Sequence, residues 1–303
     1  MFFRANFTII KIFKTLEVLH MNSWQFNNGV LKTNVPPAFS LDACLSCGQT
    51  FLFTKTKSDG WHGAVNGKAI LLKQQSDILY IENSTEEDIP FWHNFFAFDV
   101  DYAPLQTAFV KDEFLANAVL FEPGIRVLRQ PFFETLLMFI ISQNNNIPRI
   151  SGIVGRLCEA YGTPVSYKNF SGHTFPTAQQ MASCTVESLA FLRAGFRAKY
   201  IVDAVQCVTK GTVTQERLAT LNTEEARKLL LQIKGVGPKV ADCVLLFACG
   251  RFEVCPMDVW MMRVMQTYYP NGFPAEIEPF AGIAQQYLFH YARHNATLFD
   301  DKG

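Results

Sequence analysis

The chain has 303 residues, of which 49% are hydrophobic, and this is enough for one large or two ordinary domains with packed cores. Its 27 basic residues balance 27 acidic ones, so the formal net charge is zero. This balance argues against a protein that coats nucleic acid along a broad basic surface, and any phosphate contact must come from a local patch.

Residues 1–20 are apolar but interrupted by charged side chains such as Arg4 and Lys11. No apolar run reaches the roughly 18 residues that a membrane span requires. No small-residue cleavage site follows a clean hydrophobic core, which argues against a signal peptide. Because Met21 can serve as a translation start, we expect residues 1–20 to be a disordered or mis-annotated extension.

Residues 21–125 are predicted to form an N-terminal antiparallel β domain with flanking helices. From Trp24 to Ile81, short apolar stretches alternate with turn sequences such as Asn66-Gly67. Residues 67–83 are predicted to form two strands joined by a polar turn. The sequence therefore indicates a small antiparallel sheet at the start of the chain.

The eight cysteines are scattered along the chain. Without a secretory leader they indicate reduced thiols, so we expect a cytoplasmic protein. Cys44 and Cys47 form a lone C-x-x-C. We favour two semi-buried thiols over a metal at this pair, because structural zinc needs four ligands.

From about residue 85 the pattern changes, because apolar residues now recur at spacings of three and four. This period predicts helices that flank the β domain and then an all-α region at residues 126–303. The expected helices span 85–98, 104–120, 131–142, 147–161, 178–194, 198–210, 215–221, 223–233, 239–249, 257–269 and 276–293.

The segment TEEARKLLLQIKGVGPKVADCVLLFA, residues 223–248, predicts two helices joined by a glycine hairpin. Gly235 and Gly237 can take positive φ and let the backbone approach a ligand. Pro238 suits the first position of the second helix. Exposed amides at such a turn favour an anion, so we interpret the hairpin as a grip on a DNA phosphate, with Lys234 adding charge. The alternative is a plain αα-hairpin.

Lys239 follows Pro238 on the first turn of that second helix, where a positive charge is unfavourable. A neutral amine is favoured there, and it can act as a nucleophile and form a Schiff base. On local sequence a surface lysine that touches phosphate is equally plausible. Asp258, in Cys255-Pro-Met-Asp-Val-Trp260, is either a simple helix N-cap or a carboxylate that stabilises a sugar cation.

An amide-rich turn, Ile141-Ser-Gln-Asn-Asn-Asn-Ile-Pro-Arg149, separates two predicted helices. Consecutive asparagines can form an ordinary polar loop. They can equally offer a side chain that fills a gap in a stack of bases.

Taken together, these segments resemble the helix-hairpin-helix (HhH-GPD) DNA glycosylases, and specifically their 8-oxoguanine DNA glycosylase/lyase branch. KGVGPKVADC and CPMDVW carry the resemblance. It extends from about residue 24 to the C-terminus, with further matching segments in the expected order: LSCGQTF (45–51), ISQNNNIPRISG (141–152), AGFRAKYI (194–201) and AGIAQQYLF (281–289).

The resemblance implies an α+β fold, with a TBP-like antiparallel sheet followed by two all-α subdomains that enclose the active site. It implies base flipping, attack on C1′ by Lys239, support of the sugar cation by Asp258, Schiff-base formation and β-elimination. This chemistry requires neither a metal nor a redox cofactor. The implied partner of a monomeric enzyme is double-stranded DNA with 8-oxoguanine opposite cytosine.

The resemblance also implies residue roles. Gly48 would accept the N7 proton of the oxidised base from its backbone carbonyl, Gln285 would read the pairing edge, and Phe289 and Cys243 would sandwich the base. The implied DNA contacts are the plug Asn144, the wedge Phe196, the orphan-cytosine pair Arg149 and Arg197, and the hairpin residues Gly235 and Gly237.

Three positions depart from the best-known eukaryotic pattern: Trp260 stands where a histidine is expected, Lys234 where proline is frequent, and Phe196 where tyrosine is usual. Two rival functions stay open at this point. One is a monofunctional alkyl-base glycosylase on the same fold, which would use water instead of Lys239. The other is a non-catalytic DNA-binding module.

Overall fold

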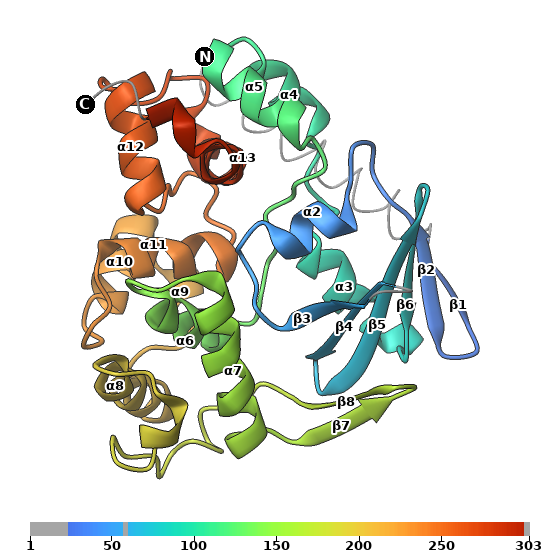
Figure 1. The fold of residues 1–303 in the computed structure, drawn as a ribbon, viewed down its shortest axis with the longest axis vertical. Coiled ribbons are helices and arrows are strands. Elements are labelled where there is room, and N and C mark those ends of the chain that lie inside the picture. Colours follow the sequence, from blue (N-terminus) through green and yellow to red (C-terminus); the bar gives the residue numbers. More distant parts are fainter. Residues whose placement is uncertain (1–23, 57–59, 300–303) are drawn as a thin grey trace.

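A computed structural model describes residues 24–56 and 60–299 of the chain. The predicted extension, residues 1–20, lies outside this part. The N-terminal region forms a six-stranded antiparallel sheet in the order β1-β2-β6-β5-β4-β3, which confirms the expected sheet (Figure 1). Its strands are β1 (Gln25–Asn27), β2 (Val30–Asn34), β3 (Phe53–Thr56), β4 (Gly60–Val65), β5 (Lys68–Gln75) and β6 (Ile78–Glu82).

The rest of the chain is mostly helical, as expected for an α+β protein. In Figure 1, α4, α5, α12 and α13 gather in one group, and α6 to α11 form a second group beside the sheet. The helices are α2 (Leu41–Ser46), α3 (Ile89–Phe95), α4 (Ala103–Phe109), α5 (Glu113–Phe121), α6 (Phe132–Ser142), α7 (Ile147–Tyr161), α8 (Arg197–Thr209), α9 (Gln215–Thr220), α10 (Thr223–Leu230), α11 (Pro238–Phe247), α12 (Val259–Tyr268) and α13 (Ala281–His294). Within the described residues, every helix is too short or too polar to cross a membrane.

Two expected helices are wrong. Residues 104–120 divide into α4 and α5, because Asp112 takes an extended conformation and its carboxylate caps α5 by accepting the Leu115 N–H at 2.8 Å. Residues 178–194 form turns and one short 3₁₀ helix, Ala190–Leu192. In that segment the Thr185 hydroxyl accepts the Ser188 N–H, and such local bonds compete with a continuous helix.

The expectation that residues 126–303 form an all-α region is wrong at one place, because this region contains a second, two-stranded sheet. Strands β7 (Pro164–Tyr167) and β8 (Phe170–His173) pair as a hairpin that extends below the main sheet (Figure 1). Its side chains contact that sheet, since the Tyr167 hydroxyl donates to Glu82 at 3.1 Å and the Phe170 ring stacks on His62 at 5.2 Å. The hairpin therefore ties α7 to the N-terminal domain.

Two hydrophobic cores support these layers. The sheet packs on an aromatic cluster that includes Trp92, Phe96 and Phe98. The helices share a larger core of mainly aliphatic residues. Glu134 of α6 is a buried carboxylic acid next to this second core. Its Oε2 has no hydrogen-bond partner among the described residues. Burial raises the pKa of Glu134 to about 8.

We expect Glu134 to make the stability of the protein depend on pH. Its pKa is higher in the folded chain than in the unfolded chain, so its protonated form favours folding and stability falls as the pH rises from about 4.5 to 8. Glu134→Gln should remove this dependence and raise the free energy of unfolding at pH 8 by about 2–4 kcal/mol. The measurement is urea denaturation at pH 5 and pH 8.

The matched control is Glu159→Gln, the same change at an exposed position of α7. It should leave both free energies unchanged. A Glu134→Gln protein that loses stability equally at both pH values would show that the carboxylate is solvated in the folded chain.

Candidate active site

A cavity of about 890 Å³ opens between the two helical groups and the loop that follows α2. It is lined by the end of α6, by one face of α13, and by the beginnings of α7, α11 and α12. Most of the site residues predicted from the sequence line it, although they come from distant parts of the chain: Gly48, Asn144, Phe196, Gly237, Lys239, Cys243, Asp258, Gln285 and Phe289. Arg149, Arg197 and Gly235 lie outside the lining.

Lys239 lies in the first turn of α11, directly after Pro238, and its side chain faces the cavity. Its Nζ donates to the Ser142 hydroxyl at 3.3 Å and lies 5.0 Å from the centre of the Phe139 ring. The Ser142 hydroxyl in turn donates to the Phe139 carbonyl at 2.9 Å. Within the described part of the chain the amine forms no ion pair with a carboxylate, so it stays available to a ligand.

Asp258 is the N-cap of α12, as one of its two interpretations predicted, and it also lines the cavity. Its Oδ1 accepts the Met261 N–H at 2.8 Å. Burial raises the pKa of the carboxyl above its ordinary value, although the Met261 N–H and the charge of Lys239 both act to lower it. The cavity therefore contains an amine and a carboxylate that interact electrostatically.

The walls beside these two groups are a mixture of apolar and polar side chains. Cys243 and Gln285 are buried, and the Gln285 Oε1 has no partner among the described residues. Burial raises the pKa of the Cys243 thiol to about 11, so the thiol is neutral at physiological pH. Phe289 is partly buried on α13, four residues after Gln285, and its ring contributes to the same wall.

Gly48 has φ +90°, in the left-handed region where only glycine is unstrained. A Cβ at this position would lie 3.3 Å from the Phe289 ring. The adjacent Gln49 is completely buried and fixes the loop. Its Nε2 donates to the carbonyls of Cys44 at 2.9 Å and Arg126 at 2.8 Å, and its Oε1 accepts the Leu128 N–H at 2.9 Å.

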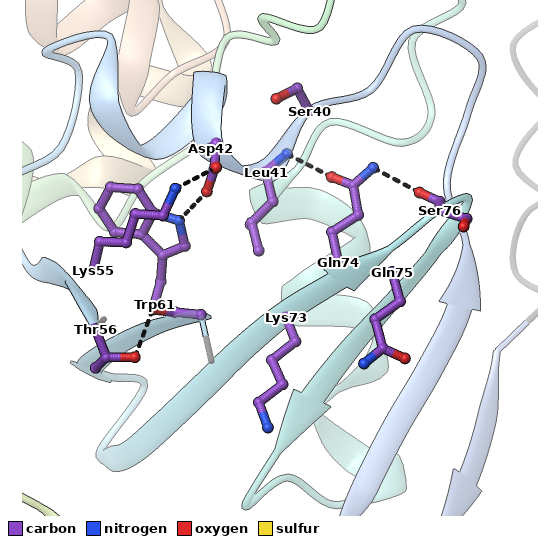
Figure 2. Close-up of a pocket in the computed structure, with 11 residues that line it drawn as sticks. Ser40, Leu41, Asp42, Lys55, Thr56, Trp61, Lys73, Gln74, Gln75 and Ser76 are labelled. Carbon is purple, nitrogen blue, oxygen red and sulfur yellow. Dashed lines mark hydrogen bonds and ion pairs between the residues drawn. The ribbon is translucent and has the colours of Figure 1, made fainter. Parts of the chain in front are cut away.

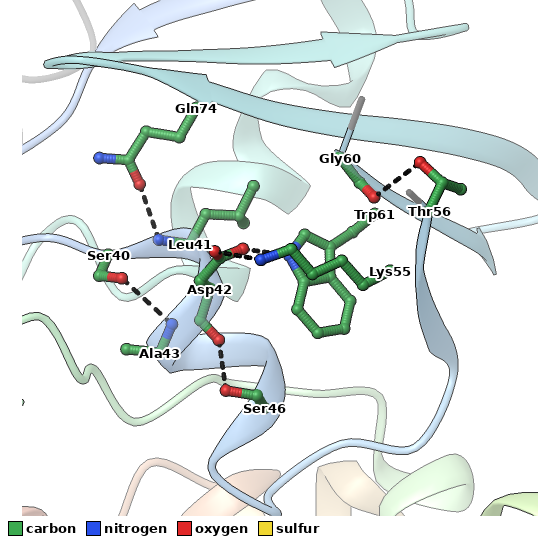
Figure 3. Close-up of polar contacts among 10 residues, drawn as sticks. All are labelled: Ser40, Leu41, Asp42, Ala43, Ser46, Lys55, Thr56, Gly60, Trp61 and Gln74. Atoms are coloured by element: carbon green, nitrogen blue, oxygen red, sulfur yellow. Dashed lines mark hydrogen bonds and ion pairs between the residues drawn. The ribbon is translucent and has the colours of Figure 1, made fainter. Parts of the chain in front are cut away.

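Helix α2, which leads into this loop, is held against the sheet by side chains on its outer side. Asp42 accepts hydrogen bonds from Lys55 and, at 2.6 Å, from the indole Nε1 of Trp61 (Figure 2). Gln74 accepts the Leu41 N–H at 2.7 Å, and the Ser40 hydroxyl caps the helix by accepting the Ala43 N–H at 3.1 Å (Figure 3). The sheet therefore positions the loop that carries Gly48.

The glycine hairpin connects α10 to α11, as predicted, but its two glycines differ. Gly235 has φ +80°, and a Cβ there would lie 2.1 Å from the Tyr200 ring, so this glycine serves packing against α8. The expectation of positive φ at Gly237 is wrong, because its φ is −95° in the extended N-cap position of α11. No atom would obstruct a Cβ there, so the backbone at Gly237 is open to a ligand.

The three asparagines between α6 and α7 are not equivalent. Asn145 donates to the Ile141 carbonyl at 3.0 Å, and Asn146 caps α7 by accepting the Arg149 N–H at 3.0 Å. Asn144 has φ +46° and is exposed, and its side chain has no hydrogen-bond partner within the described residues. Asn144 is therefore the asparagine that is free to contact a ligand.

Arg197 holds this asparagine loop in place. Its side chain is 3% exposed. Its guanidinium donates to the carbonyls of Gln143 at 2.8 Å, Asn144 at 2.8 Å and Ala194 at 3.1 Å. Phe196 is 49% exposed beside it, with its ring centre 4.4 Å from the guanidinium carbon. Arg149 is exposed and makes only a long contact, 3.4 Å, to the Arg193 carbonyl.

Arg197→Met should therefore destabilise the folded chain, because it leaves the carbonyls of Gln143, Asn144 and Ala194 without the donor that joins them. We expect a loss of about 3 kcal/mol in the free energy of unfolding. Arg149→Met, the same change at the exposed arginine, should cost less than about 0.5 kcal/mol. Thermal and urea denaturation of both variants check the difference, and equal losses would contradict the bracing role of Arg197.

Among the cavity residues that were not recognised in the sequence, two are polar residues close to the predicted site, Ser142 and Arg293. Ser142, the last residue of α6, orients the Lys239 amine. Arg293 in the last turn of α13 also lines the cavity, and its spacing of four residues from Phe289 was a usable signal.

No group of three or more His, Cys, Asp or Glu side chains that could hold a metal is present in residues 24–56 and 60–299. Cys44 and Cys47 are buried free thiols.

Comparison with known families agrees with this architecture. The N-terminal domain model of 8-oxoguanine DNA glycosylase matches residues 32–136. The HhH-GPD superfamily model, which describes base excision DNA repair proteins, matches residues 137–276. The fold and the cavity thus define the class of HhH-GPD base excision repair proteins.

Similar proteins of known structure or activity indicate one family within this class. The structure of MBOgg1 with a low-affinity DNA ligand is 35% identical, with a TM-score of 0.84 over 90% of this chain and 98% of that one. The Clostridium acetobutylicum 8-oxoguanine glycosylase/lyase, solved with double-stranded DNA containing cytosine opposite 8-oxoguanine, is 32% identical, with a TM-score of 0.84 and the same coverage, 90% and 98%. The Saccharomyces cerevisiae N-glycosylase/DNA lyase is 34% identical over 184 residues, which is 57% of this chain and 47% of the yeast enzyme. The chain belongs to the 8-oxoguanine DNA glycosylase family.

Proposed function

We propose that this chain excises 8-oxoguanine from duplex DNA and then cleaves the strand at the resulting site, as a first step of base excision repair. The observation that carries this proposal is the Lys239 amine and the Asp258 carboxylate in one cavity. A base inside a duplex is inaccessible, so the damaged nucleotide must be rotated into that cavity at a cost of a few kcal/mol.

In the proposed reaction the Lys239 nitrogen, as the neutral amine, bonds to C1′ of the flipped nucleotide. The glycosidic bond breaks with its electron pair leaving on the base, and the base takes up the proton that the amine nitrogen loses. Asp258 stabilises the positive charge that develops on the sugar. The amine then forms a Schiff base as the sugar ring opens. Removal of a proton from C2′ expels the 3′ phosphate, so strand cleavage follows from using an amine rather than water.

Base selection is proposed to rest on the Gly48 carbonyl. Oxidised guanine carries a proton on N7, and ordinary guanine does not. A buried carbonyl that accepts this proton would stay unpaired with ordinary guanine, which is a strong basis for rejection. The unpartnered Oε1 of Gln285 suits the donors on the pairing edge of the base, and the Phe289 ring and the Cys243 thiol provide the two stacking walls.

We propose double-stranded DNA with 8-oxoguanine opposite cytosine as the substrate. The free side chain of Asn144 is suited to fill the vacated stack, and the exposed Phe196 ring to wedge the neighbouring bases. Arg149 is available to the orphaned cytosine, and Arg197 holds the asparagine loop through its hydrogen bond to the Asn144 carbonyl. The open backbone at Gly237, on the N-terminus of α11, suits a phosphate.

Lys239→Gln should abolish both strand cleavage and the covalent adduct that borohydride traps between enzyme and DNA. The change removes the nucleophile but keeps a polar side chain of similar length. The measurement uses a labelled duplex with one 8-oxoguanine, and Lys228→Gln is the control, because this lysine of α10 does not line the cavity. A trapped adduct that persists in Lys239→Gln would contradict the assignment. Base release without any adduct in the wild type would favour the monofunctional alternative.

The rate of excision should fall on the acid side with the protonation of Asp258. Since burial raises the pKa of this carboxyl, the midpoint should lie above the ordinary value of about 3.9. Asp258→Asn keeps the helix cap, loses this acid limb and lowers the plateau rate by about 10²- to 10³-fold. Single-turnover rates between pH 4 and pH 8 measure both effects, and an unchanged acid limb in Asp258→Asn would exclude Asp258 as its source.

A further inference from the structure

Arg293 is a charged residue of the base cavity to which neither the fold nor the proposed reaction gives a role. It lies in the last turn of α13, on the same face as Gln285 and Phe289 at intervals of four residues. All three line the cavity. Along this face, Gln285 and Arg293 are about 12 Å apart, with Phe289 between them.

The Arg293 guanidinium lies where Gly48 and Phe289 meet. Its Nη2 donates to the Ser46 carbonyl at 3.4 Å, and its carbon lies 5.4 Å from the centre of the Phe289 ring. A Cβ on Gly48 would lie 3.2 Å from Nη1. The absence of a side chain at Gly48 therefore makes room for this end of the guanidinium.

Arg293 Nη1 is buried and has no hydrogen-bond partner among the described residues. A buried charged donor without a partner is destabilising, and folded proteins rarely retain one. Gln285 Oε1 at the other end of the same helix face is buried and unpartnered as well. The cavity thus contains a free acceptor at one end of the Phe289 ring and a free donor at the other.

We propose that Arg293 is a specificity-determining residue that donates to the oxygen on C8 of the flipped base. This inference rests on the proposed function. If the base stacks on Phe289 with its pairing edge toward Gln285, its imidazole end points along α13 toward Arg293. N7 then faces Gly48, and the C8 oxygen lies next to N7. Ordinary guanine has no oxygen on C8, so this contact adds to the discrimination that the N7 proton provides.

Arg293→Met tests the proposal, because methionine keeps much of the packing but removes the donors and the charge. Two single-turnover rates are measured: release of 8-oxoguanine, and strand cleavage at a preformed abasic site, which contains no base. We expect base release to fall about 10- to 100-fold, the effect of losing a hydrogen bond from a charged donor. Cleavage of the abasic duplex should stay within about 2-fold of wild type, since Lys239 and Asp258 are intact.

The matched control is Arg217→Met, which removes an arginine that donates to the Gly211 carbonyl at 3.3 Å away from the cavity. Both of its rates should equal those of the wild type. The proposal is overturned if Arg293→Met loses both activities in parallel, which would mean that Arg293 supports Asp258 or the fold. It is also overturned if base release does not change. A wild-type protein inactive on both duplexes would instead refute the proposed function.

Discussion

The amide side chain of Gln49 holds together two stretches of backbone that lie far apart in the sequence, the end of α2 and residues 126–128. It bonds the end of α2, the Arg126 carbonyl and the Leu128 N–H, and it is fully shielded from water. Each of these bonds is difficult to replace, because a buried amide group without a partner costs more than the bond itself contributes. These bonds anchor the loop with Gly48, which forms one wall of the cavity, to the segment that precedes α6.

The proposed reactive groups, Lys239 and Asp258, lie at the N-termini of two helices, α11 and α12, that line this cavity. Asp258 benefits from its place, since a carboxylate at an N-cap satisfies a backbone N–H and interacts favourably with the helix dipole. Lys239 has the opposite relation to the dipole of α11, and it has a hydroxyl rather than a carboxylate as its direct partner. The N-terminus of α12 thus favours the ionised carboxylate. Amine and carboxylate are then kept close together without a direct ion pair.

The sequence predicted the class of fold and the hairpin well, because both depend on local patterns. Pro238 begins α11 and Asp258 caps α12, as their residue types indicate. Elements that depend on distant contacts were missed. The β7–β8 hairpin is stabilised by the main sheet through Glu82 and His62, and nothing within residues 164–173 shows that partner. The helix expected at 178–194 fails because threonine and serine side chains form local turns instead.

The amino-acid sequence by itself determined most of the helices, which turns contain glycine, and which amine and carboxylate could react. These properties follow from local conformational preference and from the spacing of residue types. Only the tertiary structure decided that Arg197 braces a loop from a buried position, that Gly235 accommodates Tyr200, and that Arg293 has a donor free next to Gly48. Burial and hydrogen-bond satisfaction are properties of side chains brought together from distant segments, so neither can be read from the order of residues along the chain.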